Sequence, residues 1–81
     1  MKYDVIVTET APSPDGHRTK QIRCLKGVSL PKAWSVCNRA ARRGVRLFGG
    51  QVDRQNWGAV GGQANRTAYR AATIYPEGYG R

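Results

Sequence analysis

The most restrictive feature of this sequence is one amphipathic helical segment between segments of alternating polarity. Ser29 is a good N-cap, Pro31 is tolerated in a first helical turn, and Gly44 is a natural residue to follow a helix. The pattern therefore predicts a single helix over residues 29–44. At 100° per residue, its apolar side chains share one face: Leu30, Ala33, Trp34, Cys37, Ala40 and Ala41.

Two alternating segments before the helix predict an antiparallel hairpin. Residues 2–10 form its first strand and residues 19–26 its second, and Gly27 ends the second strand. Two prolines and the Asp15-Gly16 turn signal predict a loop over residues 11–18. One face of the first strand carries Tyr3, Val5 and Val7 and the other Asp4, Ile6 and Thr8, while the second strand turns Ile22 and Cys24 to the core and Arg23 outward.

The sequence after the helix predicts further short strands. Residues 45–48 read as the third strand and residues 67–75 as the last one. The glycine-rich residues 49–66 are the least regular region. Within them, Val52 and residues 57–60 allow one more short strand.

This order, β-β-α-β-(β)-β, predicts an α+β fold: a small two-layer sandwich in which one helix lies across an antiparallel sheet. A chain of 81 residues makes one domain with a thin core. We expect that domain to span residues 1–76, because Pro76 ends the last strand. Residues 77–81 are expected to form a tail.

Charge is distributed unevenly along the chain. The net charge is +9 and the pI is about 10.4, yet residues 16–52 contain no acid. A one-signed stretch of this length indicates a negatively charged partner. The nine cations in it are Arg18, Lys20, Arg23, Lys26, Lys32, Arg39, Arg42, Arg43 and Arg46. Arg outnumbers Lys ten to four, which suits phosphate or carboxylate recognition but would equally follow from a GC-rich genome.

The sequence also suggests a compartment. No signal peptide and no membrane-length apolar run are visible, so we expect a cytoplasmic protein without membrane contact. Cys24 and Cys37 are interpreted as reduced, buried residues, with an oxidised pair as the alternative.

Catalysis has little support in the sequence. The single histidine, His17, lies beside a predicted turn, and no recognised nucleophile, metal-ligand or phosphate-loop motif is present. We therefore expect no catalytic residues, no metal and no cofactor.

The polar face of the predicted helix is the first candidate binding site. Lys32, Arg39, Arg42 and Arg43 lie on it and would follow a phosphate backbone, with Arg23, Arg46 and Arg54 flanking. The alternative is a solvated helix face, on which the helix dipole favours cations near the C-terminus. That alternative leaves the first-turn Lys32 and the missing acids unexplained.

The glycine-rich segment is the second candidate site. Arg54, Arg66 and Trp57 occur there among several amides, a composition typical of a recognition loop that reads base edges or stacks on bases. For Trp57 the favoured interpretation is structural: a side chain folded back to cover a thin core.

The layout of the first 48 residues resembles that of small phage-encoded accessory proteins, including some anti-CRISPR proteins. The resemblance consists of strand, loop and strand followed by the helix opening Ser29-Leu30-Pro31-Lys32-Ala33. It implies a small accessory protein that acts by binding, and it transfers no functional residue.

Two hypotheses of function follow. The first is a non-catalytic protein that binds duplex DNA or structured RNA through phosphates. The second is a small inhibitor that docks on an acidic protein surface, and a combined form would touch both parts of a nucleoprotein complex. The sequence assigns no oligomeric state.

Overall fold

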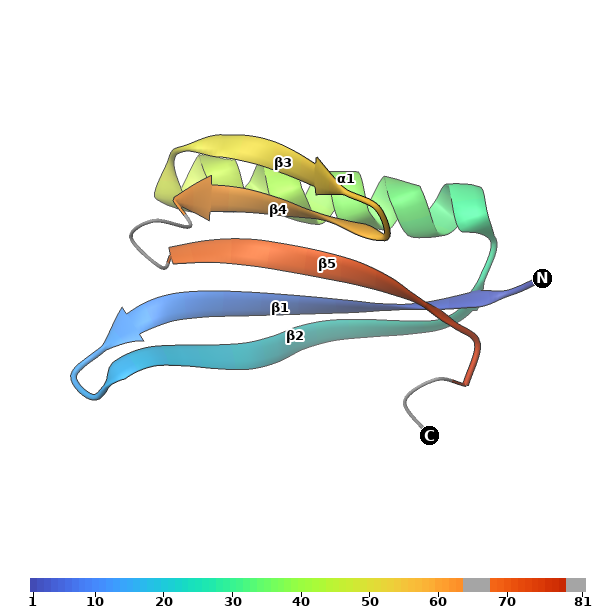
Figure 1. Ribbon diagram of the computed structural model, residues 1–81, viewed down its shortest axis with the longest axis horizontal. Helices are drawn as coiled ribbons and strands as arrows, with labels where there is room; N and C mark the ends of the chain where they lie inside the picture. The colour runs from blue at the N-terminus through green and yellow to red at the C-terminus, as the bar shows by residue number, and fades with distance from the viewer. Residues whose placement is uncertain (64–67, 79–81) are drawn as a thin grey trace.

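The computed structural model describes residues 1–63 and 68–78, which form one helix and a five-stranded sheet (Figure 1). The sheet order is β2-β1-β5-β4-β3, and every neighbouring pair is antiparallel. One helix with antiparallel strands confirms the predicted α+β class. The elements are β1 (Tyr3–Ser13), β2 (Gly16–Val28), α1 (Leu30–Phe48), β3 (Gln51–Gln55), β4 (Gly58–Gln63) and β5 (Ala68–Pro76).

Helix α1 begins where the sequence predicted but runs further. The Ser29 Oγ accepts a hydrogen bond from the Lys32 N–H at 3.4 Å, and Pro31 occupies the first turn. The helix continues through Gly44 to Phe48, so the predicted strand over residues 45–48 is wrong. It ends at Gly49, whose φ of 82° breaks the helix and whose N–H donates to the Val45 carbonyl at 2.7 Å.

The core lies between α1 and one face of the sheet. The sheet contributes Val5, Val7, Ala59, Ala72 and Ile74, and the helix contributes Ala33, Val36, Cys37 and Ala41. Ala33, Cys37 and Ala41 confirm the predicted apolar face. Trp34 is only half-buried and packs at the margin of the core, whereas Val36, which the predicted face omitted, is buried.

Small residues let the helix backbone approach strand β4 closely. Gly44 is buried in the helix, and a Cβ added to it would overlap the Gly61 carbonyl. A Cβ added to Gly61 would in turn overlap the Ala41 backbone and come within 2.7 Å of its Cα. Gly44 therefore serves helix–sheet packing and does not end the helix.

Strands β1 and β2 form the predicted hairpin, although the turn between them is much shorter than expected. Pairing extends to Ser13 and Gly16, which leaves only Pro14 and Asp15 in the turn. Most of the predicted 11–18 loop is therefore strand. Pro12 is accommodated because it lies beyond the last described β1–β5 pair, where a strand tolerates a missing N–H.

The inward positions predicted for β2 are also wrong. Ile22 is 37% exposed, Cys24 is exposed, and both cysteines are free. Two causes account for this. Strand β2 is an edge strand beyond the main cover of α1, and a β-bulge between the Val7–Arg23 and Thr8–Gln21 pairs shifts its alternation.

Asp4 ties three segments together. It is 5% exposed, and its carboxylate accepts hydrogen bonds from the Gly27 N–H at 3.1 Å and the Gly78 N–H at 3.0 Å. Gly27 has a φ of 67° at a second irregularity of the β1–β2 register, so β2 continues past it to Val28. The bonds join β1, the end of β2 and the turn after β5.

The glycine-rich segment is not a long loop where the structure describes it. Strands β3 and β4 pair from Gln51–Gly62 to Gln55–Gly58, and Asn56 and Trp57 form the tight turn between them. The Arg66 position lies outside the described residues. Within the described part of the chain, no helix is both long and apolar enough to cross a membrane.

The close helix–strand contact predicts that Gly61→Ala destabilises the fold. We expect a loss of about 2 kcal/mol or more in the free energy of unfolding, because the added methyl overlaps helix backbone that cannot move aside. Chemical denaturation followed by circular dichroism measures the loss. Gly16→Ala is the matched control: its φ is 119° but nothing lies within 4 Å of the added Cβ, so its cost is conformational only. A Gly61→Ala loss no larger than that of Gly16→Ala would contradict the contact.

The two cysteines are expected to differ in reactivity. Burial raises the pKa of the Cys37 thiol to about 11 from an ordinary 9.0, although the Arg54 guanidinium opposes the rise. At about 1 µM protein and pH near 8, a thiol reagent should label one thiol per folded chain and two after denaturation. Cys24→Ser should abolish the fast labelling, and rapid labelling of two thiols in folded chains would show the core to be open.

The same thiol gives a pH dependence of stability. The unfolded chain loses this proton near pH 9, whereas the folded chain keeps it to about pH 11. Its contribution to stability is therefore present below pH 9 and is lost as the pH rises through about 11.

Candidate functional site

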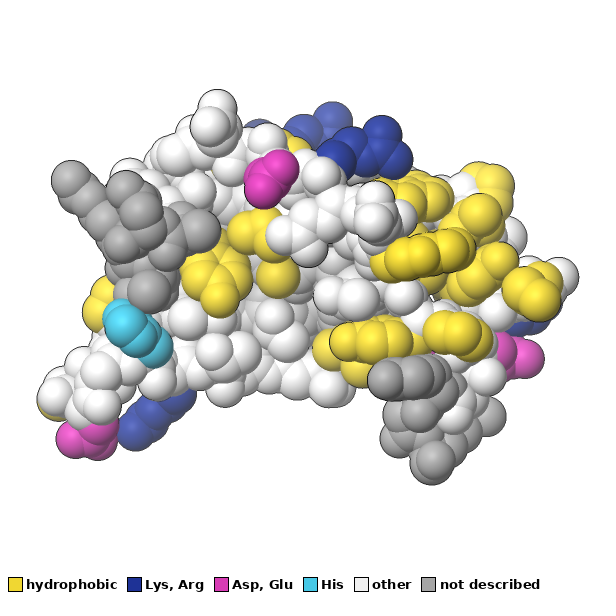
Figure 2. All heavy atoms as spheres, in the orientation of Figure 1, with side chains coloured by type: hydrophobic (Ala, Val, Ile, Leu, Met, Phe, Trp, Pro, Cys, Tyr) yellow, Lys and Arg dark blue, Asp and Glu magenta, His cyan; other side chains and the backbone are white. Residues whose placement is uncertain are grey.

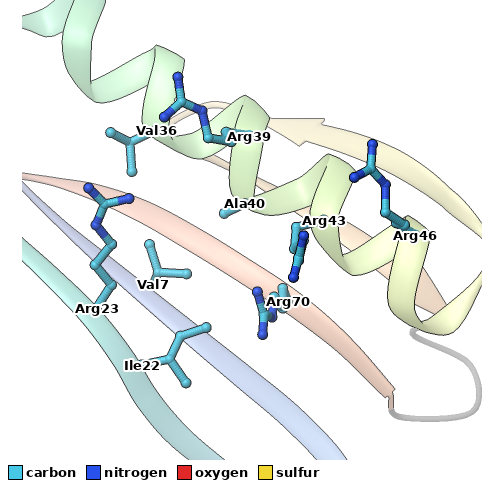
Figure 3. Close-up of a pocket in the computed structure, with 9 residues that line it drawn as sticks. All are labelled: Val7, Ile22, Arg23, Val36, Arg39, Ala40, Arg43, Arg46 and Arg70. Carbon is cyan, nitrogen blue, oxygen red and sulfur yellow. The ribbon is translucent and has the colours of Figure 1, made fainter.

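The acid-free stretch of the sequence folds into the two walls of one groove. Strand β2 forms one wall and helix α1 the other, and the groove between them has a volume of about 590 Å³ (Figure 3). None of its lining residues is acidic. They are Val7, Ile22, Arg23, Val36, Arg39, Ala40, Arg43, Arg46 and Arg70.

Helical periodicity supplies three of the arginines. Arg39, Arg43 and Arg46 are spaced by four and three residues, so they lie on one face of α1, and all three are exposed. Arg46 lies in the last turn, where the negative end of the helix dipole favours a cation. The dipole does not account for Arg39, which lies about two turns further from the C-terminus.

The bulge in β2 supplies the opposite wall. Arg23 pairs with Val7, and directly paired residues of neighbouring strands share a face of the sheet. Because Val7 faces the helix, Arg23 does too, and the extra residue Ile22 lies beside it at the base of the groove. Figure 3 shows Arg23 reaching from β2 toward α1. Arg23 is thus exposed, as predicted, but on the helix side of the sheet.

Two further cations of β2 share this side. Lys20 pairs with Glu9 and Arg18 pairs with Ala11, and both partners lie on the same face of β1 as Val7. The basic wall therefore continues along the hairpin beyond the end of the groove.

Arg70 is the one groove arginine with an acidic partner among the described residues. Its Nε lies 2.9 Å from the Glu9 Oε1, and the two residues pair directly between β5 and β1. Glu9 therefore offsets the charge of Arg70. Sequence reasoning missed Arg70, because nothing in the sequence shows that β5 pairs with β1.

Four guanidinium groups remain without an ion pair in residues 1–63 and 68–78: Arg23, Arg39, Arg43 and Arg46. Like charges gathered along one groove repel one another, so an anion in the groove would relieve an unfavourable interaction. Beneath them, Val7, Ile22, Val36 and Ala40 form an apolar floor.

The predicted basic helix face is divided between two sides of α1. Arg42 does not line the groove; it borders a separate hollow of about 310 Å³ with Asn38, Val52 and Arg54. Lys32 is exposed in the first turn and lines neither cavity. The structure thus brings Arg39 and Arg43 together with Arg23 and Arg46, and it separates Arg42 and Lys32 from them.

Arg54 and Trp57 also lie away from the groove. The Arg54 guanidinium lies 4.5 Å from the centre of the Trp34 ring, a cation–π contact that covers the half-buried indole. Trp57 is 54% exposed and stacks on Tyr3, with ring centres 6.3 Å apart and planes at 27°. Tyr3 in turn packs against the core.

The described residues contain no group of three His, Cys, Asp or Glu side chains that could hold a metal ion. The exposed Cys24 and the buried Cys37 carry free thiols. The buried Cys37 thiol, with a pKa of about 11, stays protonated at neutral pH.

The chain matches no protein-family model, no curated protein and no solved structure.

The cation–π contact predicts a structural role for Arg54. Arg54→Ala should lower the free energy of unfolding by about 0.5–1 kcal/mol, because it removes the cation from the Trp34 ring. Thermal unfolding followed by tryptophan fluorescence measures this. Arg54→Lys should restore part of the loss. If Arg54→Ala is as stable as the unmodified chain, the cation–π contact contributes nothing to the free energy of unfolding.

Proposed function

We propose that this chain is a non-catalytic nucleic-acid-binding protein that holds the phosphate backbone of duplex DNA or structured RNA in the groove between α1 and β2. The observation that carries the proposal is the set of four groove arginines without acidic partners among the described residues. We interpret the fold as a two-layer sandwich whose helix leaves the outer hairpin uncovered and so opens this groove.

Phosphates are the anions that such a set of cations suits best. Arg presents a planar fork of donors that holds two phosphate oxygens at once. Along the helix axis, Arg39 and Arg46 are about 10 Å apart, so the arginines of α1 can contact neighbouring phosphates of one strand. Each phosphate neutralised by a cation releases counterions, and this release supplies most of the free energy of non-specific binding.

The proposed contacts provide affinity without sequence preference. All four cations address the charged backbone, and no amide or aromatic side chain lines the groove to read a base. The β3–β4 hairpin, which contains Arg54 and Trp57, does not line the groove and has no part in the proposed contact.

The apolar floor favours a second candidate, an acidic segment of a protein. A peptide that alternates carboxylates with apolar side chains would place the first on the arginines and the second on Val7, Ile22 and Val36. This is the inhibitor function that the resemblance to phage accessory proteins implies. Phosphates remain the leading candidate because the apolar floor consists of only four side chains, whereas five guanidinium groups line the same groove.

Adjacent arginines on α1 provide a sharp test. Arg43 lines the groove and Arg42 does not, although both are exposed and lie in the same helical turn. With a mixed-sequence duplex near 100 mM salt, Arg43→Ala should weaken binding about eightfold and reduce the log–log salt slope by about 0.9. Arg42→Ala should change the affinity about twofold or less. Fluorescence anisotropy titrations at 50–200 mM salt measure both.

Stability serves as the folding control for this pair. Because the groove arginines repel one another, Arg43→Ala should unfold at the same temperature as the unmodified chain or higher. If the unmodified chain binds neither duplex DNA nor structured RNA at about 50 mM salt, the nucleic-acid proposal fails. Binding to an acidic protein that persists after nuclease treatment and is lost in Arg43→Ala but kept in Arg42→Ala would establish the second candidate.

A further inference from the structure

No element of the described residues covers the face of the sheet opposite the helix, and this face is built from a different set of residues. Figures 1 and 2 look onto this face, with α1 behind the sheet. The register places alternate residues of β1, β5 and β4 on it, since their neighbours point to the core. Its side chains on these strands are Asp4, Ile6, Thr8, Thr10, Val60, Tyr69, Ala71, Thr73 and Tyr75.

No Lys or Arg stands at a described position of this face on β1, β5 or β4. The one acid among these positions, Asp4, is 5% exposed and is held by the Gly27 and Gly78 N–H groups. Figure 2 shows accordingly that dark-blue side chains lie only toward the margins of this view. In a chain with 14 cations, the centre of the open face is neutral.

This charge distribution decides the kind of partner. A nucleic acid needs cations to replace its counterions, and the open face offers none on its central strands. Two copies of a chain with a net charge of +9 repel if they meet through their basic surfaces. Through the open faces they can meet without bringing cations together, so this face suits a second copy better than any other described surface.

The composition and area of the face also fit a dimer. Interface centres are depleted of charged residues and enriched in aromatic ones, and Tyr69 and Tyr75 lie here beside Ile6 and Val60. The molecule measures 40 Å by 24 Å in the plane of the view. That outline includes both edge strands, so an interface of about 800 Å² from each partner, which a stable dimer needs, extends beyond the three central strands onto β2 and β3.

We infer that two copies of this chain form a symmetric dimer through the open faces of their sheets. The interface is isologous, so each copy presents the same strands to the other. The two basic grooves then lie on opposite outer sides of the dimer. The inference does not depend on what the groove binds.

The test is the mass of the protein in solution. Sedimentation of the unmodified chain from about 1 µM to about 500 µM should show conversion from 8.9 kDa to twice that mass. Ala71→Arg and, separately, Thr8→Arg put a cation at the centre of the face, where Ala71 and Thr8 pair. Each should weaken the dimer about a hundredfold or more, because symmetry brings the new charges of both copies together. Ser35→Arg adds the same charge to an exposed position of α1 and should leave the dimer intact.

The Cys24 thiol gives a measurement that needs no variant. Cys24 pairs with Ile6 and therefore lies on the open face of β2. In the unmodified chain, its labelling by a thiol reagent should slow over the concentration range in which the mass doubles. A chain that stays monomeric throughout overturns the inference. So does a dimer that survives Ala71→Arg or Thr8→Arg, and so does a doubling of mass with no change in Cys24 labelling.

Discussion

The close approach of α1 to β4 determines where everything else in this molecule lies. Gly44 and Gly61 have no side chain and Ala41 has only a methyl group, so the helix backbone rests almost directly on the strand. This contact fixes the helix over β4 and β5 and leaves the β1–β2 hairpin largely outside its cover. A larger residue at either glycine would lift the helix from the sheet and change the width of the groove beside it.

The same closeness explains why the core is made of small side chains. The largest fully buried side chains are Val5 and Cys37, while both tryptophans remain partly or largely exposed. A gap this narrow has no space for an indole, so Trp34 lies at its margin beneath Arg54 and Trp57 rests on Tyr3. Small side chains bury little area, and the repulsion among the groove arginines opposes folding further. Interactions outside the core, such as the bonds of Asp4 to two backbone N–H groups, therefore carry more weight here than in a larger domain.

Periodicity in the sequence was enough to predict the helix, the first hairpin and the last strand, because each follows from local patterns of polarity. It was not enough at Gly44, since a glycine that ends a helix and a glycine that admits a neighbouring backbone look alike in sequence. Nor does the order of strands in the sheet follow from local patterns. That order makes β2 an edge strand, exposes Cys24 and brings Arg70 beside Glu9. The division of Arg42 from Arg43 depends on how α1 is rotated against the sheet, which its long-range contacts fix.

The bulge in β2 shows how one extra residue can assemble a site. In a regular strand, Arg18 and Lys20 would share a side with residue 22, and Arg23 would point to the opposite, open face. The extra residue at Ile22 reverses the alternation, so Arg23 joins Arg18 and Lys20 on the side that faces α1. One irregularity thereby accomplishes two things. It completes the basic wall opposite Arg39 and Arg43, and it keeps Arg23 off the neutral open face. The separation of charge between the two sides of the sheet thus depends on this bulge as much as on the choice of residues.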